Sequence, residues 1–182
     1  QPHCDSGPGN VLVLAREAYA QADIDRTFLL SGQALDLCAG DAQRLTEAET
    51  FADLLNDLGT AFSLTLSGQF EQAISEYRSV AEQAQAAGEI EIEADVNLLL
   101  GQALYFKHDL KNDFSDIITA YGTGIILWRQ VGSTLGESTG LGYLATLYED
   151  LYRYEDAITV YEQSYDLSKS IGDEPGQALA KI

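Results

Sequence analysis

Residues 151–173 read LYRYEDAITVYEQSYDLSKSIGD, and this stretch decides the fold. Its apolar residues recur three or four positions apart, which is the spacing of one face of an α-helix. Gly172 stands where a glycine cap would end that helix, and Pro175 follows where a new helix can begin. The stretch therefore predicts an amphipathic helix with an apolar face made of Tyr154, Ala157, Ile158, Tyr161, Tyr165 and Leu167.

The residues just before this stretch predict a second helix of the same kind. The apolar positions again share one helical face, and a short break around Arg153 separates the two helices. Two amphipathic helices joined by a short turn form a hairpin that cannot bury its apolar face alone, so it must stack on a neighbouring hairpin. The face of the earlier helix consists of Leu141, Leu144, Leu147, Tyr148 and Leu151.

The same arrangement recurs along the chain at intervals of about forty residues. Gly88, Gly132 and Gly172 each open a run of polar and small residues that leads into an apolar periodic segment. Their spacings of 44 and 40 residues lie in the range of helical repeat proteins. We therefore expect one domain over residues 1–182, with repeat units at about 8–40, 46–87, 91–130 and 135–171 and a partial fifth unit at 174–182.

These units resemble the tetratricopeptide repeat (TPR). That pattern has a leucine and a small residue in the first helix, an aromatic residue at the turn, and an alanine and an aromatic residue in the second helix. The resemblance implies an all-α fold, a right-handed α-solenoid of about four helical hairpins plus a partial fifth, with the tyrosines in its core. It is strongest at Leu144, Ala145, Tyr148, Tyr154, Ala157 and Tyr161 and at Leu58, Gly59, Phe62, Phe70, Ala73 and Tyr77.

The charge balance restricts the class of partner. The chain has 29 acidic and 10 basic residues, for a formal net charge of −19. Phosphate backbones and anionic lipid surfaces would be repelled, so we expect no nucleic-acid binding, and a charged partner should be basic. No apolar stretch approaches the ~18 residues that a membrane-spanning helix needs.

The cysteines and the first residues suggest an oxidising compartment. The sequence contains no methionine and begins with Gln1, as it would after removal of a secretory signal peptide. In a helical hairpin the start of the first helix lies beside the end of the second, so Cys4 should approach Cys38. We predict a disulfide between them and an extracytoplasmic or secreted location, with the cytoplasm as the alternative.

The sequence offers no recognisable catalytic, metal or cofactor site. His3 and His108 have no partners at a motif spacing, and His108 with Asp109, Asp113 and Asp116 is typical of a solvated turn. Gly140, Gly142 and Ala145 match the G-x-G-x-x-A pattern of dinucleotide-binding sites, but that pattern must follow a strand and none precedes them. The run GSTLGESTG lacks the lysine of a phosphate-binding loop. We therefore predict no enzyme activity, no cofactor and no metal.

The remaining candidate is the groove of the solenoid. Aligning the repeat pattern places Arg16, Leu98, Thr139 and Gly142 on the groove-facing side of the first helices. Family members that hold a peptide's terminal carboxylate offer lysine and asparagine there, whereas this chain offers Asn56 and several acids. The candidate partner-binding residues are Asp53, Asn56, Thr60, Asp95, Gln102, Tyr105, Thr146 and Glu149.

The resemblance implies a noncatalytic role in protein binding or scaffolding, with a protein or basic peptide in the groove. The alternative is a structural subunit that self-associates end to end into an extracellular fibre or array. A weaker alternative is the regulatory part of a longer enzyme or transcription regulator. We also expect residues 174–182 to leave an apolar end exposed that either more chain or another subunit covers, the latter through Val11 and Leu14 of its N-terminal hairpin.

Overall fold

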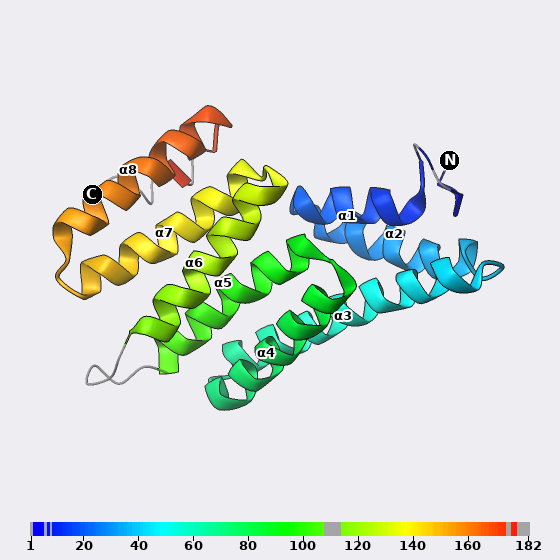
Figure 1. The fold of residues 1–182 in the computed structure, drawn as a ribbon, viewed down its shortest axis with the longest axis horizontal. Helices are drawn as coiled ribbons and strands as arrows, with labels where there is room; N and C mark the ends of the chain where they lie inside the picture. Colours follow the sequence, from blue (N-terminus) through cyan, green and yellow to red (C-terminus); the bar gives the residue numbers. More distant parts are fainter. Residues whose placement is uncertain (1, 6, 8, 108–113, 174–175, 178–182) are drawn as a thin grey trace.

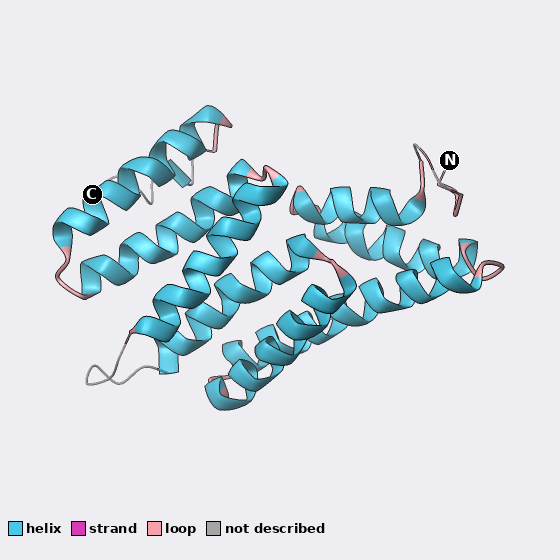
Figure 2. Ribbon diagram, in the orientation of Figure 1, coloured by secondary structure: helices cyan, strands magenta, loops and turns pink. Residues whose placement is uncertain are grey.

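The computed structural model describes residues 2–5, 7, 9–107, 114–173 and 176–177, and these residues fold into an all-helical array (Figures 1 and 2). Helices make up 83% of the described residues. They pair as four antiparallel hairpins, and the first hairpin and the last lie at opposite ends of the array (Figure 1). The helices are α1 (Val11–Ala20), α2 (Ile24–Leu37), α3 (Ala42–Leu66), α4 (Phe70–Ala87), α5 (Ile90–Lys107), α6 (Ser115–Val131), α7 (Thr134–Asp150) and α8 (Tyr154–Ser170).

Each helix packs on the next, as in a helical repeat solenoid. The first helices of successive hairpins also meet, because α3 contacts α5 and α5 contacts α7. The longest helix, α3, runs from α2 at one end to α4 at the other (Figure 1). It begins at Ala42, ahead of the unit edge expected at residue 46. The first hairpin departs from the simple order, since α1 also contacts α5.

The three glycines that revealed the repeat all end a helix in the same way. Gly88, Gly132 and Gly172 have φ angles of 74°, 78° and 71°, a left-handed conformation that side chains with a Cβ adopt only with strain. At Gly132 the N–H donates to the carbonyl of Arg129, and the N–H of Ser133 donates to the carbonyl of Trp128. This pair of hydrogen bonds is the Schellman motif, which turns the chain sharply into the next hairpin.

The turns inside three of the hairpins use the same motif without always using glycine. Gly68 has a φ of 75°, but Ala22 and Tyr152 hold φ angles of 57° and 58° at the equivalent positions. The N–H of Tyr152 donates to the carbonyl of Glu149 at 2.9 Å. Because these two residues are not glycine, their left-handed conformation could not be predicted from residue type.

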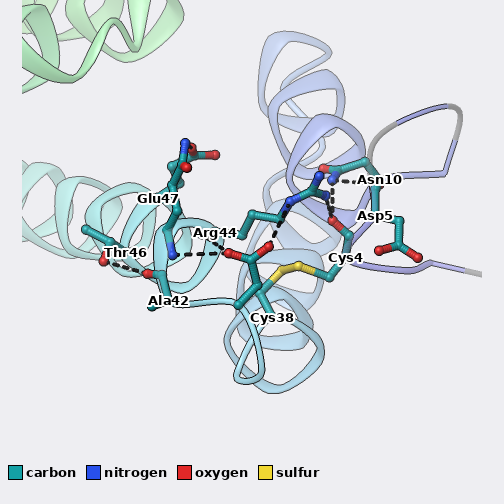
Figure 3. Close-up of polar contacts among 10 residues, drawn as sticks. Cys4, Asp5, Asn10, Cys38, Ala42, Arg44, Thr46 and Glu47 are labelled. Carbon is teal, nitrogen blue, oxygen red and sulfur yellow. Dashed lines mark hydrogen bonds and ion pairs between the residues drawn. A yellow bond between two sulfur atoms is a disulfide. The ribbon is translucent and has the colours of Figure 1, made fainter.

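The predicted disulfide between Cys4 and Cys38 is present (Figure 3). The Cα atoms are 5.2 Å apart, within the usual span of such a bridge. Asn10 caps α1 with its side-chain oxygen and donates from Nδ2 to the Cys4 carbonyl at 2.9 Å. Arg44 of α3 donates to the same carbonyl, so the segment before α1 is attached to both α2 and α3.

Small residues allow the helices to approach closely in the core. Ala145 and Ala157 are 0% and 3% exposed where α7 meets α8. At Gly124 of α6, an added Cβ would lie 2.8 Å from the carbonyl oxygen of Ala94 in α5. Such spacing leaves no room for a side chain without moving the backbone, because interiors are densely packed.

Several residues are buried or exposed contrary to the prediction from the sequence. Tyr154, expected to fill the wedge at the hairpin turn, is 55% exposed and packs edge-on against Tyr152 instead. Val11, expected at an open N-terminal face, is 0% exposed because the segment held by the disulfide covers it. Ile158, expected on the apolar face of α8, is 58% exposed, and Tyr148 and Tyr165 are half-buried. Tyr77, Tyr121 and Tyr161 are buried, as expected.

Candidate binding groove

Three of the predicted groove residues come together on one aromatic cleft between α5, α6 and α7. They are Gln102, Tyr105 and Thr146. The cleft has a volume of about 160 Å³. Its remaining lining is aromatic and apolar, made of Phe106, Tyr121, Tyr143 and Leu147.

Ring contacts and one acid shape this aromatic cleft. Tyr105 meets Phe106 edge-on with ring centroids 5.6 Å apart, and Tyr121 lies 5.8 Å from Tyr143. The Tyr105 hydroxyl donates to Asp150 at the end of α7, and this bond together with partial burial raises the pKa of Tyr105 to about 12. The phenol therefore stays neutral at physiological pH and keeps the carboxylate at the edge of the cleft.

A larger hydroxyl-lined cleft continues from the aromatic one along α7. The two share Tyr143 and Thr146, and the second has a volume of about 430 Å³. Tyr161 donates to Glu149 at 3.2 Å and lies 3.1 Å from the Thr146 hydroxyl oxygen. The lining consists of Ser138, Thr139, Gly142, Tyr143, Thr146, Tyr161, Ser164, Ser168, Asp173 and Gly176.

Asp95 lies in a third cleft, between the first hairpin and the rest of the chain. Its Oδ2 atom accepts a hydrogen bond from the Tyr19 hydroxyl of α1 at 2.8 Å. Desolvation by burial raises the pKa of Asp95 to about 6, although the hydrogen bond from Tyr19 and the nearby indole N–H of Trp128 lower it. Asp95 was predicted to face an open groove, and the structure instead packs α1 over it, which the repeat pattern could not indicate.

Two other residues expected on the groove side are engaged elsewhere. Arg16 donates from Nε to the Glu89 carboxylate at 2.9 Å, an ion pair that joins α1 to the start of α5. Leu98 is 3% exposed and belongs to the core. The contact between Arg16 and Glu89 crosses 73 residues of sequence, so no local spacing signals it.

The predicted groove residues of α3 lie apart from these clefts. Asp53, Asn56 and Thr60 are exposed, and none of them lines any of the three clefts among the described residues. The structure therefore brings together the α5 and α7 candidates and leaves the α3 candidates on open surface. The sequence analysis overlooked Tyr19 and Trp128, whose helical spacing marks them only as core residues.

The described residues provide no group of three His, Cys, Asp or Glu side chains that could hold a metal ion. The run of His108, Asp109 and Asp113 lies outside the described residues, as does most of the predicted partial unit at 174–182. Within the described part of the chain, no helix is both long and apolar enough to span a membrane. The prediction that the chain is not an enzyme stays a prediction.

Comparison with known proteins gives no family. Neither the scan against protein-family models nor the search of curated proteins found a match to this chain.

Proposed function

We propose that this chain is a noncatalytic, TPR-like binding module that holds a basic, extended segment of a partner protein in the groove along α5 and α7. The observation that carries the proposal is the aromatic cleft, where the Tyr105 hydroxyl is hydrogen-bonded to the Asp150 carboxylate at the edge. A concave, mostly apolar site with a few polar groups at its rim is the usual form of a binding site.

Charge supports a basic partner. The described residues that line the three clefts include Asp95 and Asp173 but no lysine or arginine. The net charge of −19 adds a long-range field that attracts cations. Tyrosine and phenylalanine faces also attract ammonium and guanidinium groups at distances up to about 6 Å.

The test uses a fluorescein-labelled peptide of alternating lysine and serine and measures its fluorescence anisotropy with the purified chain. We expect binding that weakens as salt rises, and no binding of a glutamate–serine peptide. Asp150→Lys should weaken binding strongly, because it places a cation at the edge of the aromatic cleft.

The matched control is Glu82→Lys, which makes the same charge change at an exposed position on α4. If both variants weaken binding equally, attraction to the net charge alone explains it and the groove proposal is wrong. Absence of any binding to the lysine peptide at low salt would contradict the proposal directly.

A second candidate function is end-to-end self-association, which an apolar patch on α2 favours. Ile24, Phe28 and Leu29 are 50%, 54% and 61% exposed on adjoining turns. Exposed apolar patches on otherwise polar proteins often mark interfaces. Sedimentation over a wide concentration range tests this candidate: Phe28→Lys should abolish any association, and a strictly monomeric chain would exclude it.

A further inference from the structure

The third cleft has features that neither neighbouring cleft shares. It lies between the end of α1, the start of α5, the end of α6 and the start of α7, and it meets the hydroxyl-lined cleft at Thr139. Its volume is about 130 Å³. The lining consists of Tyr19, Ala20, Ala22, Asp95, Leu98, Trp128, Ser133, Leu135, Gly136 and Thr139.

The Asp95 carboxylate in this cleft has no ion-pair partner among the described residues. Asp95 accepts from Tyr19, and none of the ion pairs formed by the described residues includes it. Asp95 is partly buried, so its carboxylate loses part of its hydration without gaining a counter-ion, which is unfavourable. A bound cation would remove that cost.

Trp128 is the second independent feature. It is 3% exposed, and its Nε1 atom has no hydrogen-bond partner at bonding distance. The indole N–H nevertheless lies near enough to Asp95 to lower the pKa of that carboxyl. Tyr19 and Trp128 thus turn two donors toward one carboxylate, which favours its charged form.

From these contacts we propose that the third cleft binds the ammonium group of a lysine side chain from the partner segment, with Asp95 as its counter-ion. The proposal rests on the function proposed above and adds the residue class that the partner must present. The aromatic rings of Tyr19 and Trp128 would flank the cation, an arrangement that strengthens binding when water is excluded.

Size favours lysine over arginine. An apolar protein cavity of about 150 Å³ takes up benzene, so a cleft of 130 Å³ has room for the five heavy atoms of a lysine side chain. The guanidinium of arginine is larger and planar, and it prefers a carboxylate that accepts two parallel hydrogen bonds. The Oδ2 atom of Asp95 already accepts a hydrogen bond from Tyr19, so Oδ1 is the oxygen available to a point-like cation.

The chain carries its own probe of this cleft, because Trp128 is its single tryptophan. Unlabelled lysine–serine peptide should change Trp128 fluorescence with the same midpoint that anisotropy gives for the labelled peptide. Peptides containing Nε-acetyl-lysine or arginine should not produce that change. If n-butylammonium alone saturates the signal as tightly as the peptide, the cleft is a free-amine site and the lysine assignment is wrong.

Asp95→Asn tests the counter-ion while preserving shape and the hydrogen bond to Tyr19. We expect affinity for the lysine peptide to fall at least about tenfold, with the Trp128 response lost. The control is Asp36→Asn, which removes the same charge at an exposed position on α2 outside the clefts. Melting curves should show that Asp95→Asn is no less stable than the parent chain.

Measuring the affinity for the lysine peptide as a function of pH tests the role of Asp95 independently. Tyr19 and Tyr143 are the titratable groups that interact with Asp95, and Glu91 acts on Tyr19. Burial raises the pKa of both tyrosines, so neither changes charge between pH 7.5 and pH 5.5. Lysine stays charged throughout, so affinity should fall over this range in the parent chain and stay constant in Asp95→Asn.

The outcomes separate the two proposals. If the lysine peptide binds by anisotropy but leaves Trp128 unchanged, and Asp95→Asn behaves like Asp36→Asn, this inference is overturned while the groove function stands. If no lysine peptide binds at all, both are overturned.

Discussion

The first hairpin and the three that follow are built from the same kind of helix, but they are held in place by different means. The later hairpins meet at Gly88 and Gly132, and Gly172 ends the last helix in the same way, with left-handed turns that are encoded locally. The first hairpin meets the second through residues 38–41, where the N–H of Asp41 donates to the Cys38 carbonyl and Gly40 does not adopt a positive φ. A disulfide and long-range contacts take the place of the glycine turn.

The difference shows which links of the fold are local and which are tertiary. A Schellman turn fixes the direction of the chain within a few residues, so it tolerates change elsewhere. The first hairpin instead depends on Arg16–Glu89 and Tyr19–Asp95, which connect α1 to residues on or next to α5. The packing of α1 against α5 also forms the cleft at Asp95, because α1 provides one of its walls.

The largest effect should come from placing a charge in the core of a later hairpin. Ala157→Arg forces a guanidinium into the contact between α7 and α8, where Ala157 is 3% exposed. We expect a loss of more than about 4 kcal/mol and unfolding of the fourth hairpin. Circular dichroism during melting measures this, and Thr159→Arg, at an exposed position on the same helix, should leave the melt nearly unchanged. Unchanged helicity in Ala157→Arg would contradict the packing.

Removing the disulfide should affect the first hairpin selectively. Replacing both Cys4 and Cys38 with serine releases a loop with a sequence separation of 34, which should lower stability by about 3 to 4 kcal/mol. Hydrogen exchange should show faster opening of α1 and α2 than of α5 to α8. Equal loss of protection across all eight helices would mean that the first hairpin is not a separate unit.

Asp95→Asn should stabilise the chain in a pH-dependent way. The pKa of Asp95 is raised to about 6 in the folded protein, so its ionisation disfavours folding as pH rises from about 4 through 6. At pH 7.5 the variant should gain about 2 kcal/mol after allowing for partial solvent screening, and at pH 4 the difference should vanish. Denaturant melts at the two pH values measure it, and a variant less stable at pH 7.5 would refute the assignment.

The smallest effects should come from making the turns alike. Tyr152→Gly relieves a left-handed residue that is 78% exposed, so we expect a gain of about 1 kcal/mol. Gly132→Ala should cost about 1 to 2 kcal/mol, because it places a Cβ on a residue with a left-handed conformation.

Thr146→Ala, on the groove, should change the free energy of unfolding by no more than about 0.5 kcal/mol. Thermal melts rank the three, and a gain in Gly132→Ala would contradict the turn geometry.

Much of the local structure could be predicted because helices and their caps are encoded within a few residues. The apolar spacing at Leu141, Leu144 and Leu147 predicts α7, and Gly172 stands just after α8 as a cap should. The prediction at Tyr154 failed because a turn aromatic can pack against a neighbour in the turn instead of the core. The candidate site was predicted in part: Gln102, Tyr105 and Thr146 share a cleft, whereas the α3 residues line none of those described.

The sequence by itself therefore determined the helical repeat, the glycine turns, the pairing of Cys4 with Cys38 and the acidic surface. These follow from periodicity, from the conformational freedom of glycine and from composition, all of which are properties of short segments or of the whole chain. Only the tertiary structure decided that α1 would lie against α5 and that Tyr19, Asp95 and Trp128 would share one cleft. The physical reason is that Tyr19 and Asp95 are 76 residues apart, so their contact depends on how the intervening hairpins pack.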